Sequence, residues 1–127
     1  MKYCHGLYIQ TKETENIIEK TTVDLENQSI MKSLMRTNEI DIYKATIGDY
    51  RYSIFYPAYE CEEEYDYVSL IRMKGDEIVD AIYGNAFFLN ERKQSLTEEE
   101  IDNLYEHLYD FEDTEGNIMR KVAIEYI

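Results

Sequence analysis

The chain has no tryptophan, one proline, five glycines and two cysteines, and these small numbers exclude several classes of protein. So little proline and glycine leaves no segment with the composition of a flexible linker, which favours a single domain over residues 1–127. Cys4 and Cys61 are too few for a disulfide framework. Two free thiols are typical of a reducing compartment, so we expect a cytoplasmic protein.

Long apolar runs are also missing. The run at residues 86–89 is far shorter than the roughly 20 apolar residues that cross a bilayer. Residues 1–13 contain no continuous apolar stretch of the kind found in signal peptides. We therefore expect no signal peptide and no membrane association.

Signatures of catalysis and of cofactor or metal binding are absent from the sequence. It has no nucleophile elbow, no P-loop and no dinucleotide-binding glycine motif. The histidines and cysteines lack the spacing of zinc ligands, and residues 111–122 do not fit the register of a calcium-binding loop. We expect a protein that is not an enzyme and that carries no metal and no cofactor.

Positive charge is scarce. Thirteen lysines and arginines stand against 27 aspartates and glutamates, which gives a formal net charge of -14. Without a basic cluster, we expect no direct binding of nucleic acid. An acidic surface attracts basic protein surfaces instead, and the 13 tyrosines supply the rigid contact area that is enriched where proteins meet. The composition therefore indicates a binding protein with a basic partner.

Apolar residues that alternate with a period of two predict strands along most of the chain. Residues 11–26 are ambiguous, although Thr21–Val23 favours an extended conformation. Gly6 is a candidate β-bulge, and a hairpin turn is expected at Lys74–Asp76. The expected strands lie at residues 1–10, 40–46, 50–58, 67–73, 77–83 and 117–127, with residues 86–89 as a further short candidate.

Two segments have helical spacing instead. Apolar residues three and four apart predict a short helix near residues 28–36. Thr97 and Glu100 form a capping-box pattern that begins a longer helix near residues 98–111, which should end at residues 114–116. The strands come in a run rather than alternating with helices, so the predicted fold class is α+β, with a mainly antiparallel sheet of about five or six strands. The side chains expected to face the core from the longer helix are Ile101, Leu104, Tyr105, Leu108 and Phe111.

Acidic residues concentrate in a loop at residues 60–66 and on the longer helix. Arginines of a nucleic-acid groove pair with carboxylates and stack on aromatic rings. Helical neighbours lie about 5–6 Å apart, which is comparable with the repeat of phosphates along a strand. Each cluster is equally consistent with a solvated surface. The predicted partner-binding residues are Glu60, Glu62, Glu63, Glu64, Tyr65, Asp66 and Tyr67 in the loop, and Glu98, Glu99, Asp102, Glu106 and Asp110 in the helix.

These features favour a small inhibitor that occupies the basic groove of a nucleic-acid-binding protein or nuclease by mimicking nucleic acid, as anti-CRISPR and anti-restriction proteins of phages and mobile elements do. An immunity protein or antitoxin that neutralises a nuclease toxin would bind in the same way, through acidic and aromatic side chains placed against a basic surface. A binder of a small nucleotide signal is a third alternative, and it would need inward-facing basic residues. Arg51, Arg72 and Arg120 are the candidates, but edge-strand arginines that reach toward solvent explain them equally well. The sequence does not fix the oligomeric state.

Overall fold

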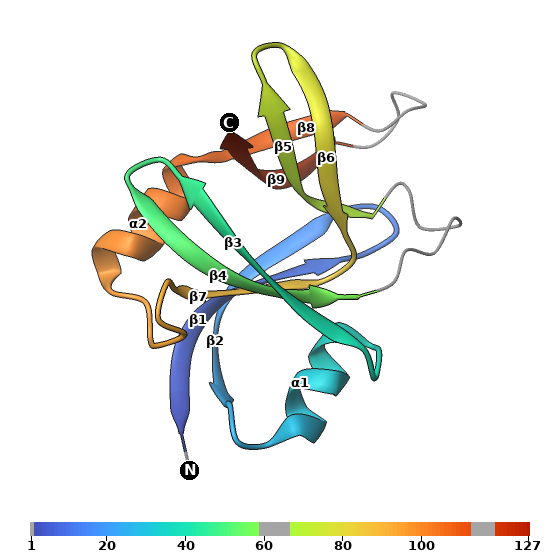
Figure 1. Cartoon of the computed structure of the whole chain (residues 1–127). Helices are drawn as coiled ribbons and strands as arrows, with labels where there is room; N and C mark the ends of the chain where they lie inside the picture. The colour runs from blue at the N-terminus through green and yellow to red at the C-terminus, as the bar shows by residue number, and fades with distance from the viewer. Residues whose placement is uncertain (1, 59–66, 113–118) are drawn as a thin grey trace.

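The computed structural model describes residues 2–58, 67–112 and 119–127, and within these ranges it contains nine strands and two helices. The strands form a five-stranded and a four-stranded sheet, so the predicted α+β class is confirmed (Figure 1). The elements in chain order are β1 (Tyr3–Thr11), β2 (Asn16–Asp24), α1 (Gln28–Met35), β3 (Ile40–Ile47), β4 (Tyr50–Pro57), β5 (Val68–Lys74), β6 (Glu77–Tyr83), β7 (Ala86–Asn90), α2 (Glu98–Glu106), β8 (Leu108–Glu112) and β9 (Met119–Tyr126).

The five-stranded sheet has the order β2-β1-β7-β4-β3, with every neighbouring pair antiparallel. Its central strand, β7, is buried from Ala86 to Leu89 because both faces of the sheet are covered. Phe87 and Leu89 pack in a cluster that includes Met31 and Met35 of α1. Phe88 points to the other face, where it packs in a cluster with residues of α2 and of the four-stranded sheet. Successive side chains of β7 therefore enter two different cores.

The four-stranded sheet has the order β6-β5-β9-β8. Strands β5 and β9 are parallel, and the other pairs are antiparallel. The expected hairpin between β5 and β6 is confirmed, and Gly75 in its turn has a φ of 61°. Two strands were not expected: β2 comes from the ambiguous segment, and β8 comes from the predicted helix.

The second helix is shorter than predicted. It begins with the expected capping box, in which Thr97 Oγ1 accepts a hydrogen bond from the Glu100 amide and the Glu100 carboxylate accepts one from the Thr97 amide. It ends at Glu106 rather than near residue 111, because residues 108–112 form β8 and pair with β9. Tyr109 and Phe111 stand at alternate positions, which favours a strand. The hydrogen bonds between β8 and β9 outweigh the weak helical preference of residues 108–112. The expected helix end at residues 114–116 lies outside the described residues.

The burial predicted for the longer helix is right at Ile101 and Leu104 and wrong at Tyr105, and two further residues contact the core from a strand instead. Ile101 and Leu104 are buried, but Tyr105 is 44% exposed. Leu108 and Phe111 are half-buried on β8 and not on the helix. The inner face of α2 also holds Asn103, a polar residue that the apolar pattern did not select.

Gly6 does not form the expected bulge. The pairing of β1 with β2 runs without a break from Tyr3 to Thr11, and Gly6 lies opposite Thr21. A Cβ at this position would collide with the carbonyl oxygen of Phe88 and with the ring of Phe87. The glycine therefore allows the close approach of β1 to β7.

A buried carboxylate joins the two sheets. Glu125 of β9 is 5% exposed and accepts hydrogen bonds from the Tyr43 hydroxyl (2.5 Å) and the Thr46 amide (2.6 Å), both on β3. It also accepts a hydrogen bond from Arg72 Nε on β5, at 3.1 Å. Three donors from two sheets satisfy this charge, which compensates for its removal from water.

Candidate partner-binding surface

The helix α2 is held in place by a buried amide. The Asn103 side chain donates to the Ile47 carbonyl oxygen (2.7 Å) and to the Tyr52 hydroxyl (2.9 Å), and its own oxygen accepts from the Asp49 amide (3.2 Å). The Tyr52 hydroxyl in turn donates to the Glu100 carbonyl oxygen at 2.6 Å. These bonds fix the helix against the turn between β3 and β4, in addition to the apolar contacts of Ile101 and Leu104.

The turn beneath the helix requires glycine. Gly48 has a φ of 59°, and a Cβ there would collide with the Asn103 side-chain oxygen and with the ring of His107. The His107 ring donates a hydrogen bond from Nδ1 to the Asn103 carbonyl oxygen, at 2.7 Å. The turn and the helix are therefore in close contact.

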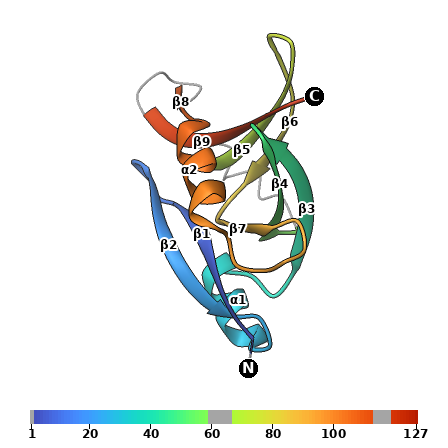
Figure 2. The ribbon, with the colours of Figure 1, turned by 90° about the vertical axis from the view of Figure 1, so that its left-hand side faces the viewer.

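The outer face of α2 combines acid and tyrosine. Glu98, Asp102 and Glu106 are exposed and follow one another at four-residue spacing, which places them along one stripe of the helix. Tyr105 follows Asp102 by three residues, which makes the two side chains neighbours on the helix surface, and it exposes 44% of its surface. Within the part of the chain that the structure describes, none of the three carboxylates forms an ion pair. Figure 2 shows α2 in front of the sheets.

The acidic surface continues toward the turn between β3 and β4. Glu99 is exposed and accepts a hydrogen bond from the Tyr50 hydroxyl at 3.2 Å. Burial raises the pKa of Tyr50, and the neighbouring Glu99 charge raises this pKa further. An open hollow of about 430 Å³ lies beside these residues. It is lined by acids and bases together, among them Asp49, Glu91 and Arg92.

The structure brings together only part of the predicted binding set. Glu98, Glu99, Asp102 and Glu106 share α2, whereas Asp110 lies on β8 and forms an ion pair with Lys121 at 2.7 Å. The helical placement predicted for Asp110 is therefore wrong, because the helix ends before it. In the loop set, Tyr67 has its ring 5.0 Å from the guanidinium carbon of Arg120. The loop residues Glu60, Glu62, Glu63, Glu64, Tyr65 and Asp66 lie outside the described residues.

Two of the three strand arginines point inward. Arg120 is 1% exposed and donates to the backbone oxygens of Lys12 and Glu13 and to the Asn16 side chain. Arg72 is half-buried against Glu125. Both belong to interior strands of the second sheet, so they are not edge arginines that reach toward solvent. Arg51 is exposed.

Sequence reasoning missed Asn103 and Glu125, which fix the helix and join the sheets. A signal was present for each. Asn103 lies between Ile101 and Leu104, whose buried side chains attach the helix to the core. Glu125 shares one face of β9 with Ala123, a core residue, because alternate residues of a strand face the same side. A polar residue on a core-facing side needs a buried partner, and that requirement identifies both positions.

No family model, curated protein or solved structure matches this chain. Among the described residues, none of the helices has the length and apolar character needed to cross a membrane. The same part of the chain contains no group of three histidine, cysteine or acidic side chains placed to hold a metal ion.

Proposed function

We propose that this chain is a small acidic inhibitor that binds a basic protein, in the cytoplasm, by occupying the groove in which that protein holds nucleic acid. The observation that carries the proposal is the outer face of α2. Three carboxylates at four-residue spacing lie beside an exposed tyrosine on a helix that is fixed to the sheet. A cationic groove offers such a surface both charge and stacking partners.

The hydrogen bonds that anchor the helix support this function. A surface that is ordered before binding loses little conformational freedom when the complex forms, so more of the interaction energy appears as affinity. The net charge of -14 would steer the chain toward a cationic partner and raise the association rate at low salt. An immunity protein that neutralises a nuclease toxin would use the same surface. A toxin gene beside the gene for this chain would favour that alternative.

The test begins with a partner captured from host lysate and then purified. We expect the chain to displace nucleic acid from this partner in direct competition, and less effectively as the salt concentration rises. Neutralising the stripe with Glu98→Gln, Asp102→Asn and Glu106→Gln should weaken partner binding by roughly tenfold at low salt. Tyr105→Ala should weaken it by a similar factor, as expected for an aromatic anchor.

A matched control changes the same number of charges elsewhere. Glu13, Glu15 and Glu19 are exposed on the β1–β2 hairpin, and replacing all three by glutamine should leave affinity within about twofold. Equal losses for both triple variants would mean that only net charge matters and would remove α2 from the interface. A third variant with Glu62, Glu63 and Glu64 changed to glutamine tests the loop. A partner without affinity for nucleic acid would contradict the proposal.

A further inference from the structure

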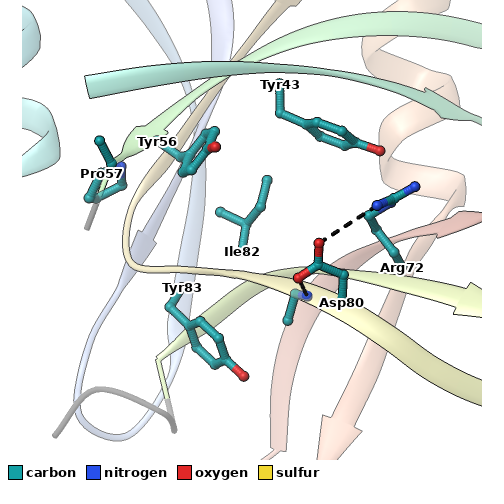
Figure 3. A pocket seen from close by; sticks show the side chains of 9 residues that line it. Tyr43, Tyr56, Pro57, Arg72, Asp80, Ile82 and Tyr83 are labelled. Atoms are coloured by element: carbon teal, nitrogen blue, oxygen red, sulfur yellow. Dashed lines mark hydrogen bonds and ion pairs between the residues drawn. The ribbon is translucent and has the colours of Figure 1, made fainter. Parts of the chain in front are cut away.

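A cavity of about 200 Å³ lies between the two sheets, away from α2. Figure 3 shows Tyr43 and Tyr56 pointing into it from the first sheet, with Ile82 and Asp80 facing them from β6. Arg72 lies along one side, while Tyr83 points away from the centre. Ile82 is buried, whereas Asp80 is exposed, so the cavity has an apolar floor and an acidic rim.

The described lining carries one fixed charge of each sign, Arg72 and Asp80, and two more carboxylates, Glu125 and Asp41, act on the lining residues. Arg72 forms ion pairs with Glu125 (3.1 Å) and with Asp80 (3.6 Å), so its charge is already opposed by two carboxylates. Among the described residues that line the cavity, Arg72 is the one cation. Burial raises the pKa of Tyr56, and the nearby Asp41 and Asp80 charges raise it further. Asp41, Asp80 and Glu125 together outnumber Arg72 around the cavity, and this charge balance favours a cation over an anion.

Size and aromatic lining narrow the choice of ligand. Sites for small molecules commonly enclose about 300–1,000 Å³, so this cavity suits a headgroup rather than a nucleotide. Arg72 already places its guanidinium carbon 5.2 Å from the centre of the Tyr43 ring, which is cation–π geometry. Tyr56 offers a second ring beside an acidic rim, the combination that recognises organic cations.

We propose that this cavity binds the guanidinium or alkylammonium headgroup of an organic cation, with Tyr56 as its aromatic wall. Asp80 is its counter-charge, because the exposed Asp80 carboxylate is 3.6 Å from Arg72, whereas Glu125 pairs with the same arginine at 3.1 Å. The site goes beyond the proposed function and does not rest on it, since the cavity and the stripe on α2 share no residue. The cation can come from a free amine or from an arginine or lysine side chain of a protein.

The experiment titrates the ¹⁵N-labelled full chain with capped arginine (N-acetyl-L-arginine amide) and with tetramethylammonium chloride, at constant ionic strength. We expect saturable shifts of the backbone amides of Asp80, Ala81 and Ile82. Inorganic phosphate should cause no saturable shift there. A response that is linear for every salt, or that spreads over the acidic residues of α2 instead, would overturn the proposal.

Variants separate the site from general charge attraction. Asp80→Asn keeps the acceptor for the Ala81 amide but removes the charge, and it should weaken cation binding by roughly five- to tenfold. Tyr56→Leu should have a similar effect. Asp76→Asn removes the same charge from the exposed turn of this hairpin and should change affinity by less than about twofold. Equal losses for Asp80→Asn and Asp76→Asn would refute a specific site.

Two further probes identify the source of the cation. Agmatine represents a free guanidinium compound, and a capped Gly-Arg-Gly peptide represents a protein side chain. Tighter binding of agmatine supports the site for a small free cation, and tighter binding of the peptide supports it for a protein side chain. Failure of both to bind would contradict the proposal, whatever the charge variants of α2 do to partner binding.

Discussion

Replacing Leu104 by alanine tests how α2 is attached to the core. Leu104 is fully buried and packs in the cluster between the two sheets. Its truncation removes apolar contacts and leaves a cavity, which generally costs about 2–5 kcal/mol. The hydrogen bonds of Asn103 hold the helix one residue away, so the helix cannot move inward to fill the space. We therefore expect a loss of about 3–5 kcal/mol, in the upper part of that range.

Urea denaturation followed by circular dichroism measures this loss. With an m-value of about 1–3 kcal/mol per molar for a small protein, the midpoint should fall by roughly 2 M. Tyr105→Ala is the matched control on the next residue, because its side chain is exposed and alanine favours helix, so stability should change by less than about 0.5 kcal/mol. If the two substitutions have equal effects, or if Leu104→Ala loses less than about 1 kcal/mol, the described packing is wrong.

Three more predictions follow from the same contacts. Asn103→Ala should destabilise the protein by about 1–3 kcal/mol in urea denaturation, because the Ile47 carbonyl oxygen loses its buried donor and the Asp49 amide loses its acceptor. Gly48→Ala should destabilise the protein more than Gly75→Ala. Both glycines have a positive φ, but of the two only Gly48 would place its new Cβ against Asn103 and His107. Similar losses of stability for the two variants would show that the turn is not close to α2. Burial raises the pKa of Tyr43 and Tyr52 to about 12, helped at Tyr43 by Glu125. The two neutral hydroxyls therefore contribute fully to the free energy of unfolding below the unfolded-state pKa of about 10, and this contribution should be lost as the pH rises from about 10 to 12. Tyr43→Phe and Tyr52→Phe should each reduce the pH dependence of the urea midpoint over this interval.

Local patterns predicted most elements because they depend on neighbouring residues. The capping box at Thr97 and Glu100 and the turn at Gly75 follow from side-chain and backbone geometry within a few residues. The strand β8 could not be found in this way. Residues 108–112 fit a helical face as well as a strand, and the decision depends on pairing with β9.

The surface that we propose was predicted only in part. The exposed acids of α2 follow from sequence spacing, but the exposure of Tyr105 does not. Spacing places Tyr105 on the face of Ile101, four residues earlier. In the structure Asn103 is buried on the inner face instead, and the Tyr105 side chain is exposed. The cavity beside Arg72 depends on residues from four strands, so no local pattern contains it.

The central position of β7 has a consequence for synthesis on the ribosome. β7 pairs with β1 and β4, which precede it by a long stretch of chain; Leu7 and Ile54 both lie opposite Phe88. Until residue 90 has emerged, the hairpins β1–β2 and β3–β4 each have an open inner edge that can pair with another chain. Such long-range pairing also slows folding. Nascent chains that stall before β7 should therefore aggregate or bind chaperones, whereas chains that stall just after it can close the five-stranded sheet.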